Sequence, residues 1–283
     1  MNKCLYCYKE LEGGQVDFHP TCARKFFGSA AVPALPYTRE NMSELAKQVI
    51  RTSTSVTGVQ AKMSLDINRG GKNEAKKFTV VGLWGKYIFK PQSDTYPCLP
   101  ELEDVTMKMA DVAGIRTVKH TLIRLADGEL GYLTERIDRG KKGEKISMLD
   151  MCQLSNRLTE HKYYGTYPQL ADTIGKYSSA PLLDIQRFWE VVLFSWLTGN
   201  SDMHCKNFSI VDMGGRKSGF TREDFLGAMT SSGISAAVAQ KLLERLVSFL
   251  PEWEELVDAS FLPEELKSSY KDLLKERIRR LTK

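Results

Sequence analysis

Residues 202–207 hold the densest group of side chains that could do chemistry. Directly after a strongly apolar run stand Asp202, His204, Lys206 and Asn207. Asp202 and Asn207 fit the spacing D-x-x-x-x-N, which is typical of a kinase catalytic loop. The Asp of such a loop accepts or orients the proton of an attacking hydroxyl, and the Asn binds Mg²⁺ through its amide oxygen. The spacing therefore indicates phosphoryl transfer.

His204 allows two other interpretations, as a metal ligand or as a general base. No second His stands nearby in the sequence, which disfavours both. Cys205 has no adjacent base pattern, so we expect it to pack in the interior.

A second group of reactive side chains lies near the beginning of the chain. Cys4 and Cys7 form C-x-x-C, His19 and Cys22 form H-x-x-C, and the pair Gly13-Gly14 turns the chain between them. Two ligand pairs that a turn brings together are what a tetrahedral zinc site requires, and clustered cysteines favour metal over disulfides in a cytoplasmic chain. The alternative is a small knuckle that packs buried thiols without a metal.

A kinase also needs a lysine that is held at the end of a strand. Residues 78–91 read as β-rich, and their second part places Tyr87 and Phe89 on one face with Ile88 and Lys90 on the other. A lysine at a strand end is usually a surface residue that reaches water. The role of Lys90 therefore depends on its neighbours.

Residues 100–114 predict a helix that could supply an acidic partner for Lys90. Pro100 suits the first helical position. The apolar stripe of this helix consists of Leu102, Val105, Met109 and Val112. Glu101 and Glu103 flank the stripe on opposite sides. The position of the stripe therefore does not show which of the two is the partner of Lys90.

The order of the predicted elements matches a protein-kinase-like fold. A strand, turn and strand around Gly58 come first, then the strand of Lys90, the acidic helix, a hairpin of residues 117–125 and 130–137, and the loop of Asp202. The other predicted helices span residues 41–50, 148–158, 167–176, 184–198, 221–232, 234–249 and 263–282. This order predicts an α+β, bilobal fold with a β-rich N-lobe and a mostly helical C-lobe. Its predicted parts are a Cys/His knuckle at 1–28, the N-lobe at 29–139 and the C-lobe at 140–283.

Composition limits the location and the partners of the chain. No apolar run reaches the roughly 20 residues that cross a bilayer, and the N-terminus lacks the apolar region of a signal peptide. We therefore expect a cytoplasmic protein without membrane contact. The net charge of +5 is spread along the chain, so no direct nucleic-acid binding is expected.

Five strings resemble the HipA family of serine/threonine kinases, which are toxins of bacterial toxin–antitoxin modules. The strings are SVTGVQAK (55–62), YIFKPQ (87–92), LPELEDVTMKMADVAGI (99–115), YLTERIDR (132–139) and LTGNSDMHCKNFSI (197–210). A full-length HipA carries an extra N-terminal subdomain ahead of the nucleotide loop, and only about 50 residues precede that loop here. The sequence is therefore most similar to the short HipT form of HipBST-type systems.

The resemblance implies roles for the N-lobe residues. The loop over the ATP phosphates would consist of Thr57, Gly58, Val59, Gln60, Ala61 and Lys62. Lys90 would bind the α- and β-phosphates, and the family pattern favours Glu103 over Glu101 as its partner. The backbone of Glu135, Arg136 and Ile137 would line the adenine. Autophosphorylation is implied at Ser55 and Thr57, where added negative charge would switch the enzyme off; ordinary turn chemistry is the alternative for these two hydroxyls.

The resemblance also implies roles in the C-lobe, cofactors and partners. Asp202 would be the catalytic Asp, with His204, Lys206 and Asn207 alongside the nucleotide and Asn207 binding Mg²⁺. The cofactors would be ATP and Mg²⁺. The protein substrate implied is an aminoacyl-tRNA synthetase, and the implied partners are a HipB-like DNA-binding antitoxin and a small HipS-like protein.

The second metal-binding Asp of the family's pattern has no clear counterpart after Asn207. Asp212 is a candidate, but in an extended chain its Cα would lie about 16 Å from that of Asn207, too far to share one Mg²⁺. Two explanations are open: a segment is missing after residue 210, or a true deletion makes the chain an impaired pseudokinase. A small-molecule phosphotransferase is a further alternative, although such enzymes favour His where Asn200 stands.

Overall fold

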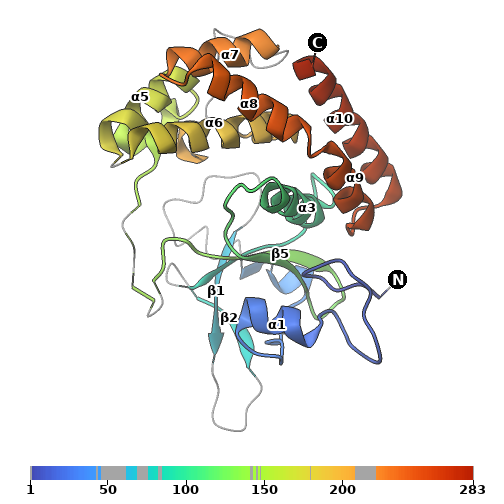
Figure 1. Cartoon of the computed structure of the whole chain (residues 1–283). Coiled ribbons are helices and arrows are strands. Elements are labelled where there is room, and N and C mark those ends of the chain that lie inside the picture. Colours follow the sequence, from blue (N-terminus) through green and yellow to red (C-terminus); the bar gives the residue numbers. More distant parts are fainter. Residues whose placement is uncertain are drawn as a thin grey trace. The chain divides into compact units, whose positions relative to one another are not determined.

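In the computed structural model the chain forms two compact units, and each is described by itself. The structure describes residues 2–42, 44–45, 62–68, 76–81, 85–140, 143–144, 146, 148–178, 180–207 and 221–282. The first unit combines residues 1–108, 117–147 and 258–262, and the second combines 109–116, 148–257 and 263–283 (Figure 1). All five named strands belong to the first unit, whereas the second is helical.

The first unit is built on an antiparallel sheet with the strand order β2-β1-β3-β5-β4. Its strands are β1 (Met63–Asn68), β2 (Lys77–Val80), β3 (Tyr87–Lys90), β4 (His120–Arg124) and β5 (Leu130–Glu135). Tyr87 and Phe89 are buried while Ile88 and Lys90 are half-buried, which confirms the predicted alternation along β3. The register places Lys90 opposite Tyr132 of β5, so these two side chains share one face of the sheet.

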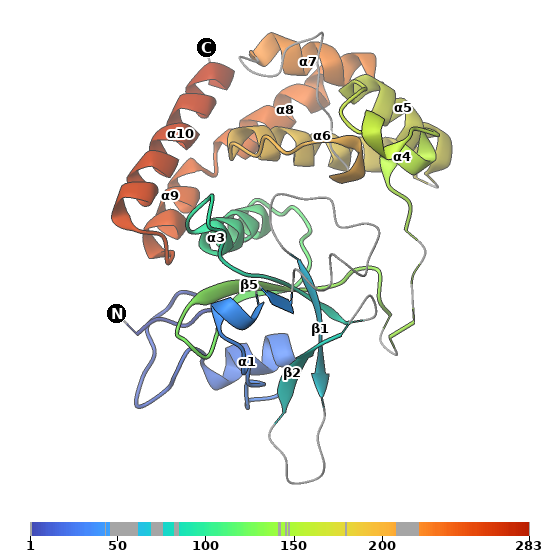
Figure 2. The ribbon, with the colours of Figure 1, turned by 180° about the vertical axis from the view of Figure 1, so that it is seen from behind.

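Two helices of the first unit lie on opposite faces of this sheet, as the two views show (Figures 1 and 2). The helix α1 (Pro20–Phe27) packs Phe26 into a core with sheet residues such as Phe78 and Phe89. The first part of α3 (Leu99–Val112) covers the face that carries Lys90. One face of the sheet thus carries the apolar core around Phe89, and the other face carries Lys90.

The burial of α3 departs from the predicted stripe. Val105 and Met109 are fully buried, but Val112 is 41% exposed. The buried face continues instead at Ala113, four residues after Met109, and it also includes the fully buried Asp104. The prediction for Val112 was wrong because the buried positions 105, 109 and 113 follow a spacing of four, which leaves position 112 at the edge of the buried face.

The second unit consists of helices. They are α4 (Met151–Leu154), α5 (Tyr167–Tyr177), α6 (Pro181–Leu197), α7 (Arg222–Ser231), α8 (Ala236–Val247), α9 (Leu250–Ala259) and α10 (Glu264–Thr282), with short 3₁₀ turns η1 (Thr159–His161) and η2 (Cys205–Asn207). The last two residues of α9 are grouped with the first unit. Capping boxes fix the starts of α4, α5 and α7, where Asp150, Thr166 and Thr221 accept from backbone N–H groups three residues on.

Two helix predictions of this region were wrong. The helix expected at 148–158 ends at Leu154, and Asn156 has a left-handed backbone with φ of 53°. The helix α9 was not among the predicted helices; Pro251 lies in its first turn, where proline loses no hydrogen bond. The other predicted helices between residues 167 and 282 agree with the structure to within a few residues.

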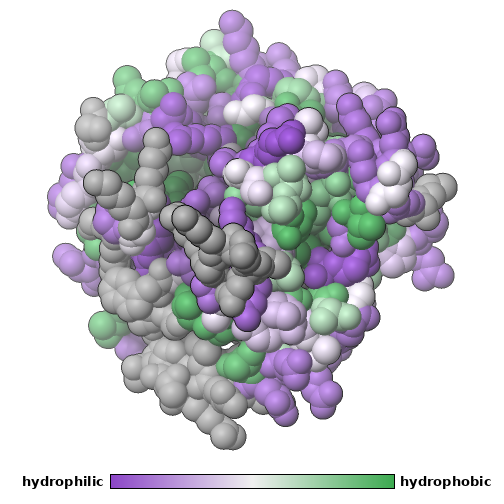
Figure 3. All heavy atoms as spheres, turned by 90° about the horizontal axis from the view of Figure 1, so that it is seen from below, coloured by the Kyte–Doolittle hydropathy of each residue, from purple (hydrophilic) through white to green (hydrophobic). Residues whose placement is uncertain are grey.

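The surface is mixed in character. On the face drawn in Figure 3, small hydrophobic areas are interspersed among hydrophilic residues. Among the helices that the structure describes, none combines the length and the apolar character needed to cross a bilayer.

Candidate active site and metal centre

Lys90 and Glu103 form an ion pair in the first unit. The distance between Lys90 Nζ and Glu103 Oε1 is 2.5 Å, and both side chains are partly buried, with 19% and 29% exposed. Lys90 Nζ also lies 5.5 Å from the ring centroid of its cross-strand neighbour Tyr132. A strand and a helix therefore hold the ammonium group at a defined place, which is how a kinase presents its phosphate-binding lysine.

Glu101, the alternative partner for Lys90, is bound elsewhere. Gln92 Nε2 lies 2.9 Å from both carboxylate oxygens of Glu101 and also donates to the carbonyl of Leu130 at 3.2 Å. Burial raises the pKa of the Glu101 carboxyl, because an uncharged amide partner offsets little of the lost hydration. The geometry thus places Glu103 against Lys90, and its catalytic role stays a prediction.

The segment expected to line adenine follows β5. The N–H of Glu135 donates to Lys119 O and that of Arg136 to Lys86 O, both at 2.9 Å. These two donors are therefore occupied within the first unit. An adenine ring would have to bond to the carbonyl groups of the segment or to the N–H of Ile137, whose side chain is exposed.

The next residues are fixed by an ionic cluster. Arg136 donates Nε–H and Nη2–H to the two oxygens of Asp138 at 2.8 and 2.7 Å. Arg139 Nη1 also donates to Asp138 at 2.7 Å. These hydrogen bonds, led by that of Arg136, lower the pKa of Asp138. The chain beyond β5 is thus held by charge-assisted bonds.

The residues of the predicted catalytic loop lie in the second unit, beyond the end of α6. Asn200 Oδ1 accepts from the N–H of Asp202 at 3.1 Å, and the Asp202 side chain is 70% exposed. His204 is buried, with Nε2 3.8 Å from Asp202 Oδ1 and its ring edge-on to Tyr163. Burial lowers the pKa of His204 and so favours the neutral ring.

The remaining predicted functional residues of both units are only partly described. Lys206 is half-buried in η2, and of Asn207 only the backbone, in the same turn, is described. Lys62 is exposed directly before β1. Outside the described residues lie Ser55, Thr57, Gly58, Val59, Gln60, Ala61 and Asp212.

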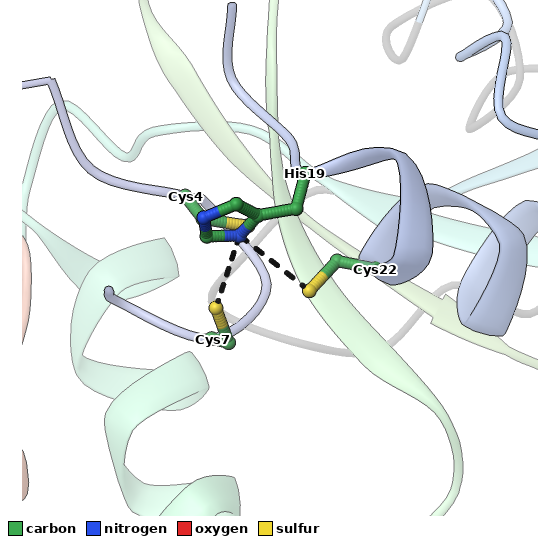
Figure 4. A group of neighbouring side chains, drawn as sticks. All are labelled: Cys4, Cys7, His19 and Cys22. Carbon is green, nitrogen blue, oxygen red and sulfur yellow. Dashed lines mark hydrogen bonds between the residues drawn. The ribbon is translucent and has the colours of Figure 1, made fainter. Parts of the chain in front are cut away.

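Four side chains near the N-terminus converge as the sequence predicted. The ligand atoms of Cys4, Cys7, His19 and Cys22 all lie within 4.8 Å of one another. His19 Nδ1 is 3.5 Å from Cys7 Sγ and 3.8 Å from Cys22 Sγ (Figure 4). Three sulfurs and one imidazole nitrogen form a donor set of the kind that binds structural zinc.

Local structure explains why these four side chains meet. Cys4 and Cys7 flank a tight turn in which the N–H of Tyr8 donates to Cys4 O at 2.9 Å. His19 occupies the N-cap position of α1 and Cys22 lies one turn later, so both point to the same side of that helix (Figure 4). The sequence spacing was sufficient to find this group.

A buried polar cluster around Asp104 was not predicted. Asp104 is fully buried; Tyr8 Oη donates to its Oδ2 at 2.6 Å, and His120 Nδ1 lies 2.8 Å from its Oδ1. Lys108 Nζ lies 3.5 Å from Oδ2. An acidic residue in an amphipathic helix is normally assigned to the solvent face, and only the Lys at i+4 hinted at another arrangement.

A family model and curated relatives match the chain. The model of the HipA-like C-terminal domain matches residues 54–221, more than half of the chain. A Haemophilus influenzae protein is 26% identical over 190 residues, covering 63% of this chain and 53% of that protein. The Sinorhizobium fredii protein Y4dM is 30% identical over 169 residues, covering 56% and 40%. The names of both relatives describe them provisionally as kinases. The chain spans about half of the length of these relatives or less.

Solved structures share the fold. HipA from Shewanella oneidensis, solved with HipB and its operator DNA, superimposes with a TM-score of 0.62 at 21% identity over 89% of this chain and 74% of that one. The proinflammatory kinase CtkA of Helicobacter pylori gives 0.51 at 15% identity over 76% and 92%. These similarities confirm the predicted α+β, kinase-like fold.

Proposed function

Because the chain belongs to the family of HipA-like C-terminal domains, we propose that it is an ATP-dependent serine/threonine protein kinase. The observation that carries the proposal is the ion pair between Lys90 Nζ and Glu103 Oε1 at 2.5 Å. Kinases use such a pair between a strand lysine and a helix glutamate to bind ATP productively. The relatives named as kinases support the same activity.

In the proposed reaction the chain's own residues bind phosphate and orient a hydroxyl. Lys90 neutralises charge on the α- and β-phosphates, while Glu103 limits the positions that its ammonium group can take. Asp202 accepts the proton of the attacking hydroxyl, and its 70% exposed side chain is accessible to a protein substrate.

Magnesium would neutralise charge on the transferred phosphoryl group when bound. Asn207 would supply an amide oxygen, a ligand type that suits Mg²⁺. Within the described part of the chain we identify no second ligand beside it, and the segment 208–220 that follows lies outside that part.

We further propose that the kinase is a HipT-like toxin that acts in the cytoplasm. Its protein substrate would be an aminoacyl-tRNA synthetase, its antitoxin a HipB-like DNA-binding protein, and a small HipS-like protein a third partner. The fold shared with HipA, whose solved structure includes HipB, supports the antitoxin assignment. Ser55 and Thr57 are the proposed autophosphorylation sites.

The test is incubation with radiolabelled ATP, Mg²⁺ and a panel of aminoacyl-tRNA synthetases. Label on a synthetase, lost in Lys90→Met and Asp202→Asn, is the expected result. Binding of ATP without any transfer would establish the pseudokinase alternative. Label on a small alcohol alone would establish a small-molecule phosphotransferase.

A further inference from the structure

We propose that Cys4, Cys7, His19 and Cys22 bind one structural Zn²⁺, and that this centre fixes Tyr8 so that its hydroxyl holds the helix of Glu103. The metal site stands independently of the proposed kinase activity. The effect of Tyr8 on catalysis rests on the proposed kinase activity. The structural test of its positioning role does not.

The distances from His19 Nδ1 to two of the sulfurs fit tetrahedral zinc. Zn–S bonds of about 2.3 Å and Zn–N bonds of about 2.0–2.1 Å at tetrahedral angles place S and N about 3.6 Å apart. The observed distances from His19 Nδ1 are 3.5 Å to Cys7 Sγ and 3.8 Å to Cys22 Sγ. Both distances match those expected around a tetrahedral zinc ion, and all four donor atoms lie within 4.8 Å of one another.

A second contact orients the imidazole for metal binding. His19 Nε2 lies 2.9 Å from the carbonyl oxygen of Glu10, so that nitrogen carries the proton and donates. Nδ1 then presents its lone pair to the three thiols, and a backbone carbonyl is a usual outer partner of a zinc-binding histidine.

Packing of thiols alone explains this arrangement less well. The single lone pair of His19 Nδ1 accepts one S–H at a time, whereas Cys7 and Cys22 both approach it (Figure 4). A metal ion is bonded by all four groups at once. Three thiolates and one imidazole also favour Zn²⁺ over Mg²⁺ or Ca²⁺, which prefer oxygen ligands.

Tyr8 connects this centre to the helix α3. It directly follows Cys7 and has a φ of 64°, a left-handed conformation that is unfavourable for a residue with a Cβ. Its hydroxyl donates to Asp104 at 2.6 Å. Metal bonds to Cys4 and Cys7 would hold the turn that imposes this conformation and so keep the hydroxyl aimed at α3.

The hydrogen bond from Tyr8 to Asp104 is linked to both Glu103 and Lys90, the two residues of the ion pair. Asp104 is adjacent to Glu103 in α3, so fixing one restrains the other. Asp104 also binds His120, whose ring stacks on Tyr132 with centroids 5.9 Å apart. The same Tyr132 ring lies beneath Lys90 Nζ at 5.5 Å. Tyr8 is therefore a positioning residue, and it acts through α3.

The first test measures metal in the full-length chain. Elemental analysis of freshly purified protein should give about one zinc per chain, and Co²⁺ replacement should give thiolate-to-cobalt charge-transfer absorption. Cys7→Ser should lose most of the metal, while Cys98→Ser, which alters a thiol outside the cluster, should retain it. The proposed zinc site would be refuted if the wild-type protein bound neither zinc nor cobalt. It would also be refuted if Cys7→Ser kept its full zinc content. The wild-type measurements decide the question even if Cys7→Ser fails to fold.

The second test follows hydrogen exchange of amides 101–108 in α3, with Tyr8→Phe as the variant. Loss of a hydrogen bond to a buried carboxylate should speed exchange about 10-fold, and the zinc content should stay unchanged. Chelator-treated wild type should show the same local acceleration. Unchanged exchange in both samples would refute the positioning role. This result is independent of phosphate transfer, so an inactive wild-type enzyme would count against the proposed function alone.

Discussion

The two sets of candidate catalytic residues differ in how firmly their own unit holds them. In the first unit, Lys90 is paired with Glu103 at 2.5 Å and both are partly buried on regular elements. In the second, Asp202 lies on a loop and is 70% exposed, with its N–H capped by Asn200. Under the proposed function, the difference corresponds to a division of tasks: the groups assigned to the nucleotide are fixed in advance, whereas the group assigned to a protein hydroxyl stays accessible.

The most severe test of this comparison is Asp202→Asn. The rate of phosphate transfer should fall about 10³–10⁴-fold, because the amide cannot accept the hydroxyl proton. ATP affinity should change little, since the exposed carboxylate is assigned to the hydroxyl and not to the nucleotide. Steady-state kinetics with ATP titration measures both quantities. Asp172→Asn, at another exposed acid of the second unit, should behave as wild type; equal damage there would contradict the assignment.

The next test separates Glu103 from Glu101. Glu103→Gln should lower kcat on the order of 10²-fold by releasing Lys90. Glu101→Gln should change kcat less than about 3-fold, because Glu101 already pairs with the uncharged Gln92. Kinetics of the two variants side by side decides the matter. The reverse order of effects would show that the observed ion pair is not the functional one.

A stability test examines the buried polar cluster around Asp104 in the first unit. Asp104→Asn should lower the free energy of unfolding by about 2–3 kcal/mol, because a buried carboxylate that accepts from Tyr8 and binds His120 is lost. Urea unfolding followed by circular dichroism measures it. Asp111→Asn, on the exposed side of α3, is the matched control. A loss as small as that of the control would mean that the cluster does not stabilise the unit.

The smallest expected effect concerns pH and the second unit. Burial lowers the pKa of His204 below its ordinary value of 6.5. The folded state therefore holds the ring neutral, so this contribution to stability is complete above about pH 6.5 and is lost as pH falls through the lowered pKa. Thermal unfolding at pH 7.5 and 5.5 should show a smaller pH dependence for His204→Gln than for wild type. An identical dependence would contradict this origin.

Local patterns predicted most of the fold that positions these residues. The alternation along β3 placed Lys90 on the face opposite Tyr87 and Phe89, and the acidic start of α3 supplied both candidate glutamates. Such patterns follow from the period of a strand or helix and need no knowledge of distant partners. The C-x-x-C and H-x-x-C pairs are likewise local patterns, which the spacing along the sequence shows without knowledge of distant partners.

Contacts between distant parts of the chain could not be predicted. The spacing left Glu101 and Glu103 equivalent because Gln92 and Leu130, which bind Glu101, come from other elements. The burial of Asp104 depends on Tyr8, far away in the sequence. The helix α9 was missed although its Pro251 lies in the first turn, a position that tolerates proline.

The left-handed backbone at Tyr8 has a consequence for how the sequence can evolve. Glycine would adopt that conformation without strain, so drift should replace this tyrosine wherever its hydroxyl has no partner. Its partner Asp104 lies 96 residues away. The two positions should therefore covary among homologues, and lineages that lose the Cys/His pairs should lose this tyrosine and this acid as well.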